Sequence, residues 1–341
     1  MRALLLLLLI LYASEIALAQ SDEILSVGAG VTPPKLLRKV EPTYTDVARN
    51  ALVQGTALFE VVVGTNGRLR DIAVVSPIGF GLDERAAEAM KQWEFEPAQK
   101  EGKPVNVRAN IEVNFRFPEI WYDAKQEKRR TQYNQAARNL QQSDPKTLQR
   151  AVETIQDLSK QRFPPATYLH AVLLREGKLL SKDPVQSLAL LSFAAEKNYG
   201  PAVYEMGRMY LEGQDLPLDR NRGLRLIHEA AVAGSAGAQA HLGAMYEAGV
   251  EAPRDLPRAR RYFRLCAAGN QPECQVRLAR LLLNQSPRAD RDYIQAIAWL
   301  QLASDAGQPQ AKALLAQEAI TLTDDQKAWA TKLKAQLVRR S

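Results

Sequence analysis

Nine residues beginning at Ala202 read AVYEMGRMY, and 36 positions later the stretch beginning at Ala238 reads AQAHLGAMY. Both stretches keep a small residue at the same place, Gly207 in the first and Gly243 in the second. A fixed period of this length is typical of stacked helical pairs, because one pair cannot bury its apolar face alone. The repeat therefore predicts an all-α solenoid for the larger part of the 341-residue chain.

Other residues keep the same register and predict where the helices begin and end. Glycines recur at Gly177, Gly213 and Gly249, and aspartates recur at Asp183, Asp219, Asp255 and Asp292. We expect the first helix of each unit to end at the glycine, which tolerates the left-handed conformation. We expect the second helix to begin after the aspartate, whose carboxylate caps free N–H groups. In the four units, the second helices are predicted to end at Asn198, Gly234, Gly269 and Gly307.

Residues 202–210 and 238–246 resemble the Sel-one-like repeat, a relative of the tetratricopeptide repeat. The resemblance predicts four units over residues 164–308, with capping helices over 309–341. Two polar stretches, Asp123–Gln142 and Pro145–Arg162, predict a helical connector over residues 119–163. Arrays of this family are scaffolds with a concave face that binds proteins. A rigid spacer is the alternative interpretation.

Residues 32–118 predict a small α+β domain. Thr56–Val63 and Leu69–Ser76 are β-branched runs joined by Asn66-Gly67, a pair typical of tight hairpins. Thr45–Leu52 and Leu82–Trp93 predict two helices. Residues 105–117 alternate strictly between apolar and polar, so one face of this last strand should meet a core and the other water. We expect a three-stranded antiparallel sheet with both helices on one face.

This domain resembles the C-terminal domain of the TonB family. The matching elements are Glu41-Pro42-Thr43-Tyr44, Gln54-Gly55-Thr56, Asn66-Gly67, Gly81-Leu82-Asp83, Trp93-Glu94-Phe95-Glu96-Pro97 and Gly102-Lys103-Pro104. The resemblance implies a periplasmic module that adds a peptide from an outer-membrane receptor to its sheet edge. The edge residues it implies are Val107, Asn110, Glu112 and Asn114. Packing against the repeats alone is the alternative role.

The first residues predict export. Met1-Arg2 is followed by the apolar run Ala3–Leu11, and Ala17-Leu18-Ala19 places small residues where a signal peptidase reads them. We expect residues 1–19 to be removed between Ala19 and Gln20, leaving a periplasmic chain without a membrane span. The alternative is an uncleaved inner-membrane anchor, as in a TonB-type energy transducer, although Glu15 interrupts the apolar run. The short stretch before residue 32 lacks the long spacer that such a transducer needs.

The two cysteines, Cys266 and Cys274, stand near the end of one predicted helix and the start of the next. Antiparallel helices joined by a short turn bring such positions within disulfide range. Export to an oxidising compartment favours the bridge. Two buried thiols are the alternative. Cysteine-rich members of the Sel-one-like family have a similar arrangement.

Catalytic and cofactor motifs are missing from the sequence. His170, His228 and His241 fall on different repeat helices, and the chain has no phosphate loop, nucleophile elbow or dinucleotide fingerprint. We therefore predict a non-enzymatic protein without metal or cofactor. Its formal net charge of +7 is spread over many residues, so we expect protein or peptide partners in the envelope rather than nucleic acid. A hydrolase for cell-wall material is the remaining enzymatic alternative.

Overall fold

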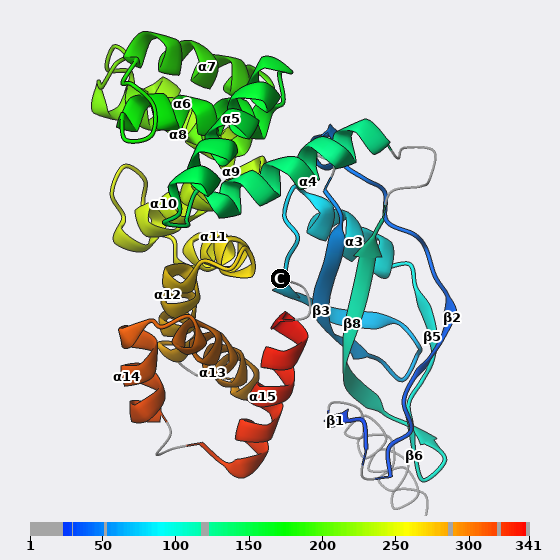
Figure 1. Ribbon diagram of the computed structural model, residues 1–341. Coiled ribbons are helices and arrows are strands. Elements are labelled where there is room, and N and C mark those ends of the chain that lie inside the picture. The colour runs from blue at the N-terminus through cyan, green and yellow to red at the C-terminus, as the bar shows by residue number, and fades with distance from the viewer. Residues whose placement is uncertain are drawn as a thin grey trace, which may run out of the picture. The chain divides into compact units, whose positions relative to one another are not determined.

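The computed structural model describes residues 23–28, 30–50, 53–116, 123–285, 289–318 and 322–338. It divides into two compact units (Figure 1). The first unit holds the described residues up to Thr45 and Gly55–Phe115, and the second holds those of Asp46–Gln54 and from Arg116 onward. The predicted signal segment, with Ala19 and Gln20, lies outside the described residues.

A four-stranded sheet forms the centre of the first unit. Its strand order is β1-β8-β3-β4, with bounds β1 Ile24–Ser26, β8 Asn106–Phe115, β3 Gly55–Val63 and β4 Leu69–Ser76. The three predicted strands pair antiparallel, β8 with β3 and β3 with β4. The fourth strand, β1, joins the outer side of β8 in parallel and was not predicted.

The hairpin between β3 and β4 turns at Gly67, as the Asn-Gly pair predicts. Gly67 has φ 71, and a Cβ there would lie 2.0 Å from the carbonyl oxygen of Phe95. The amide of Phe95 in turn donates to the carbonyl of Gly67 at 2.9 Å. This residue must therefore be glycine for two reasons, its backbone conformation and the close approach of the neighbouring chain.

Helix α3, Leu82–Met90, packs apolar side chains into the core of this unit. The fully buried residues there include Phe59, Leu82 and Met90. Trp93 follows the helix, and its indole N–H donates to the carbonyl oxygen of Val40 at 2.8 Å. Two small two-stranded sheets complete the unit: β2 Lys35–Arg38 with β5 Glu94–Glu96, and β6 Gln99–Lys100 with β7 Lys103–Pro104.

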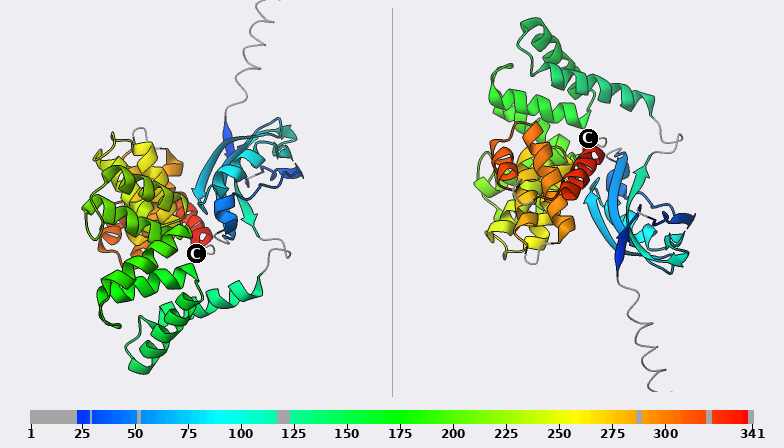
Figure 2. Two further views of the ribbon diagram at one scale, coloured as in Figure 1. Left: turned by 90° about the horizontal axis from the view of Figure 1, so that it is seen from above. Right: turned by 90° about the horizontal axis from the view of Figure 1, so that it is seen from below.

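Helices make up the second unit. The first is α2, Asp46–Asn50, which lies within the helix predicted at 45–52 but belongs to the second unit, whereas the sequence predicted it in the sheet-containing domain. The others are α4 Ala124–Asn139, α5 Pro145–Lys160, α6 Pro164–Glu176, α7 Pro184–Glu196, α8 Gly200–Glu212, α9 Arg220–Val232, α10 Ala236–Ala248, α11 Leu256–Ala268, α12 Pro272–Leu283, α13 Asp290–Asp305, α14 Pro309–Glu318 and α15 Asp324–Val338. Figure 2 shows the helical array from two further directions.

The helix boundaries follow the period in the first three repeats. Asp183, Asp219 and Asp255 each accept an amide hydrogen bond at 2.9 Å from the residue three positions on. Gly177, Gly213 and Gly249 end the first helices with φ between 66 and 74. The small residues at 207 and 243 allow close packing, because a Cβ on Gly243 would lie 2.6 Å from the Phe263 ring.

One expected boundary in the array was wrong, and one helix end, at Gly269, lies where predicted but has a different backbone conformation. Helix α13 begins at Asp290, so Asp292 lies in its first turn and does not cap it. Gly269 has φ −78, and the following Asn270, with φ 56, takes the left-handed position instead. Asparagine is the residue other than glycine that adopts this conformation most readily, so the turn needs no glycine there.

Candidate functional site

The candidate site in the first unit is the strand β8, which pairs with β3 at every position from Val107 to Phe115. Its apolar side chains at Val107, Val113 and Phe115 are buried and those at Ala109 and Ile111 are half-buried. The polar side chains that alternate with them, at Arg108, Asn110, Glu112 and Asn114, are exposed. The predicted alternation is therefore present along the strand. It separates a core face from a polar face, as in a sheet covered on one side.

The four residues implied for the peptide edge divide into two groups. Asn110, Glu112 and Asn114 lie on the exposed, polar face of β8. Val107 is fully buried and lies opposite Leu25 of β1 in the sheet register. The structure thus brings three of the four residues to one face and places the fourth in the core, beside a strand that the sequence did not predict.

Polar contacts tie this face of β8 to β3. The hydroxyl of Thr56 donates to Oδ1 of Asn114, and Nε of Arg108 lies 3.6 Å from Oε1 of Glu60. Asn106 departs from the expected pattern because it is buried, and its Oδ1 accepts the amide of Thr65 at 3.2 Å. This amide–side-chain bond fixes the start of β8 to the hairpin loop and removes Asn106 from the water-facing set.

The second candidate surface lies on the first helices of the repeats. Nη1 of Arg175 is 3.1 Å from Oε2 of Glu205, and Nη1 of Arg277 is 3.0 Å from Oε2 of Glu247. Each pair joins one repeat to the next across 30 residues of chain. Glu205 is only 14% exposed, so its pair is screened less than an ordinary surface pair. These pairs link the first helices of neighbouring repeats.

The histidines of the array lie against aromatic rings rather than in a cluster. The ring of His241 is 6.1 Å from that of Tyr204, and His228 lies 6.4 Å from Tyr262. Nδ1 of His170 is 3.2 Å from the hydroxyl of Ser159. Burial lowers the pKa of all three imidazoles, so each is mainly neutral at pH 7. Across the described residues, no group of three or more His, Cys, Asp or Glu side chains is arranged to hold a metal ion.

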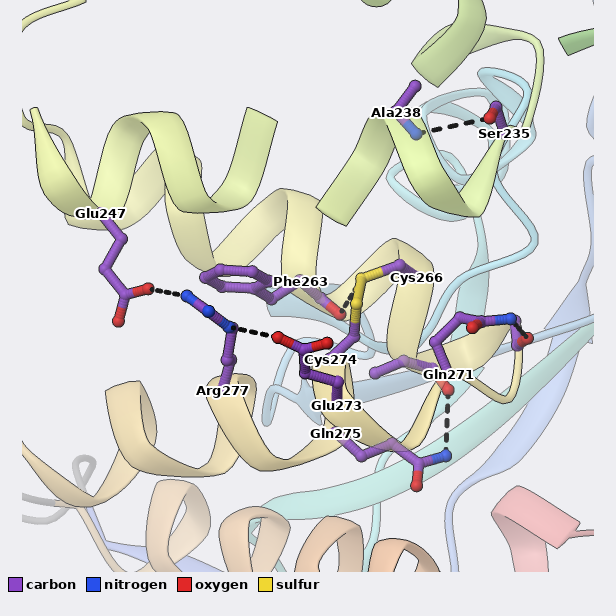
Figure 3. The surroundings of a disulfide bond; sticks show 12 residues. Ser235, Ala238, Glu247, Phe263, Cys266, Gln271, Glu273, Cys274, Gln275 and Arg277 are labelled. Atoms are coloured by element: carbon purple, nitrogen blue, oxygen red, sulfur yellow. Dashed lines mark hydrogen bonds and ion pairs between the residues drawn. A yellow bond between two sulfur atoms is a disulfide. The ribbon is translucent and has the colours of Figure 1, made fainter. Parts of the chain in front are cut away.

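Cys266 and Cys274 form a disulfide that joins α11 to α12 (Figure 3). Their Cα atoms are 5.9 Å apart, and both side chains are buried. The bridge crosses the turn between the third and fourth repeats. Beside it, Glu247 and Arg277 form the ion pair between the same two repeats. A covalent and an electrostatic link therefore fasten one junction of the array.

In the described part of the chain, no helix is both long and apolar enough to cross a membrane.

Comparison with known proteins finds a family-model match in each unit of the chain. Residues 40–117 match the family model of the Gram-negative bacterial TonB protein C-terminal domain. The Sel1 repeat model matches four times, at residues 164–199, 200–235, 236–270 and 272–308. Domains of both kinds mediate protein–protein interactions.

The chain covers less than two thirds of the length of each relative described here. The chain is 34% identical over 101 residues to the protein TonB of Vibrio cholerae serotype O1, which is 29% of this chain and 41% of that protein. A Sel1 repeat protein from Oxalobacter formigenes is 28% identical in its crystal structure, with TM-score 0.45 and 58% of each chain covered. The protective antigen c5321 of uropathogenic Escherichia coli is 22% identical, with TM-score 0.45, over 64% of this chain and 47% of that one.

Proposed function

We propose that this chain is an exported, periplasmic, non-enzymatic binding protein with two interaction modules. The sheet-containing unit adds an extended peptide from an outer-membrane or other envelope protein to strand β8. The helical repeats hold a second protein partner. Outer-membrane transport is the process that such an assembly would serve.

The observation that carries this proposal is the match of residues 40–117 to the TonB C-terminal domain, combined with the position of β8 in the sheet. Family members of this kind are envelope proteins. Beyond its short pairing with β1, β8 has β3 as its one strand neighbour among the described residues. A strand in this position offers main-chain hydrogen bonds to an extended peptide, which is the basis of binding by strand addition.

The repeats support the scaffold part of the proposal. Four units in one register, with a disulfide and ion pairs between neighbours, hold a surface of first helices in a fixed geometry. A preorganised surface loses less conformational entropy on binding than a flexible one. A catalytic site in the array would need its histidines close together. His241 and His228 instead lie on different helices, each against a tyrosine ring.

Site-specific photocrosslinking in living cells tests the proposal. A photoreactive amino acid at Asn114, on the exposed face of β8, should crosslink an outer-membrane or periplasmic protein. The matched control carries it at Asp71, an exposed residue of β4 at the far side of the sheet. Equal crosslinking from both positions, or none from Asn114, would reject β8 as the peptide site.

A further inference from the structure

The strand β1 occupies part of the edge that the proposed function assigns to a partner peptide. Ile24, Leu25 and Ser26 lie opposite Asn106, Val107 and Arg108 of β8, in parallel. The contact is short: it has three register positions, whereas β3 pairs with β8 at nine. Figures 1 and 2 show β1 at one end of β8. The edge of the sheet is therefore already partly filled by the chain itself.

A glycine turn connects β1 to the rest of the unit. Gly28 and Gly30 have φ 116 and 85, and a Cβ added to either would meet no atom within 4 Å. These glycines are thus required by the backbone conformation and not by close packing. The amide of Val31 donates to the carbonyl of Gly28 at 3.0 Å, which closes the turn. Two glycines with positive φ, each with open space where a Cβ would lie, give the turn the features of a hinge.

The chain beyond this hinge is fixed firmly to β6. The amide of Thr32 donates to the carbonyl of Gln99 at 2.8 Å, and the amide of Gln99 donates to the hydroxyl of Thr32 at 2.9 Å. Val31 also forms a β-bridge with Lys100. One side of the hinge is therefore anchored by reciprocal hydrogen bonds. On the other side, the described residues from Glu23 onward contain the three-residue strand β1 as their one regular element.

From this arrangement we infer that β1 is a latch: an intramolecular ligand of β8 that a partner strand displaces. The inference rests on the proposed function, because it concerns the regulation of the same edge. The displacing strand enters parallel to β8 and presents an apolar side chain where Leu25 lies. Displacement uncovers the side of β8 that β1 occupies at Asn106–Arg108 and lengthens the edge available to the partner.

The fraction of time for which β1 is paired with β8 sets the apparent affinity of this edge for a partner strand. A tethered strand competes at an effective concentration in the millimolar range, so a short contact is enough to keep it bound most of the time. If β1 is paired for about nine-tenths of the time, the apparent Kd of a competing strand rises about tenfold. Release of β1 should therefore lower the apparent Kd by the same factor of about ten.

Hydrogen exchange tests whether β1 protects β8. Leu25→Pro disrupts the middle of the latch, and Glu23→Pro, one residue before the strand, is the matched control. We expect faster exchange within Asn106–Arg108 in Leu25→Pro than in Glu23→Pro, with exchange in β3 unchanged. Equal exchange in the two variants would overturn the latch.

A reversible crosslink tests displacement itself. Ser26 and Arg108 are exposed register partners, so the double variant Ser26→Cys/Arg108→Cys locks the latch when oxidised and frees it when reduced. The probe is a fluorescein-labelled peptide of residues 20–28, the chain's own β1. We expect no binding to the oxidised form, weak binding to the wild type and about tenfold tighter binding to Leu25→Pro. Wild-type protein with the same reductant controls for effects on Cys266–Cys274. Equal binding to the oxidised and reduced forms would refute displacement.

The two proposals fail in different ways. Binding of the β1 peptide to Leu25→Pro, without an envelope partner crosslinked at Asn114, would keep the latch and reject the proposed function. An envelope partner that binds the locked and the free chain equally would keep the proposed function and overturn the latch.

Discussion

At the scale of single residues, Asp83 is a buried carboxylate of the first unit with a raised pKa. It is 5% exposed and accepts the amides of Ile78 and Gly79, each at 2.8 Å. Burial raises its pKa to about 6, against the lowering effect of these two hydrogen bonds. The folded state therefore binds a proton more tightly than the unfolded state.

This pKa predicts the direction of a pH effect. The contribution of Asp83 to stability is fully present below about pH 4 and is lost as the pH rises through about 6. A shift of about two pKa units corresponds to about 3 kcal/mol. In Asp83→Asn this dependence should disappear, and the loss of one amide acceptor should cost about 1–3 kcal/mol at pH 4. Urea unfolding of the wild type and of Asp83→Asn at several pH values measures the free energy of unfolding. If that free energy changes with pH in the same way in both proteins, the prediction is contradicted.

The cysteine pair gives a second prediction at this scale. Replacing both Cys266 and Cys274 with alanine should lower the free energy of unfolding of the array by about 2–3 kcal/mol, because the bridge closes a short loop. Hydrogen exchange should rise in α11 and α12 and stay unchanged in β3, which belongs to the other unit. Free thiols in protein purified from the periplasm without reductant would show that the bridge does not form there.

At the scale of elements, alanine substitutions at two glycines distinguish the effect of close packing on stability from that of helix propensity. Gly243→Ala places a methyl group against the buried Phe263 ring, so we expect a loss of about 1–3 kcal/mol despite alanine's better helix propensity. Gly269 is the matched control, because its added Cβ has no neighbour nearer than 3.4 Å and its φ is −78. Gly269→Ala should be neutral or stabilise by up to about 1 kcal/mol. Thermal unfolding followed by circular dichroism compares the two, and equal effects would show that the helix contact is not tight.

The strand β8 gives the second prediction for an element. Strand addition depends mainly on backbone hydrogen bonds, each contributing about 0.5–1.5 kcal/mol net. Asn110→Pro removes a donor and disturbs the edge, so it should abolish binding of the crosslinked partner. Asn110→Ala should weaken binding only modestly. Circular dichroism must first show that the proline variant is folded; normal binding by that folded variant would move the site to the repeats.

At the scale of the whole molecule, the role of the chain depends on its first segment. We predict cleavage between Ala19 and Gln20, and a bulky residue in Ala19→Phe should block it, because the signal peptidase accepts small residues there. Mass spectrometry of the native protein should find Gln20 at the amino terminus. A retained segment 1–19 would favour the anchored energy transducer over the exported binding protein.

The sequence by itself determined the architecture of the array and most of the sheet. The 36-residue period, the capping aspartates and the glycine ends are local signals, since each concerns residues within one helix or turn. The disulfide also follows from local spacing, because Cys266 and Cys274 flank one short turn. The alternation of β8 correctly predicted the buried Val107, Val113 and Phe115 and the exposed polar side chains between Arg108 and Asn114.

Only the tertiary structure decided what lies beside β8. A strand of three residues is too short to show a period, and β1 pairs with a segment more than 80 positions away. The buried state of Asn106 likewise depends on the amide of Thr65 in a separate hairpin loop. The start of α13 at Asp290 and the left-handed Asn270 were likewise seen only in the structure. The surroundings of the start of β8 were set by contacts between distant segments, which a local pattern does not record.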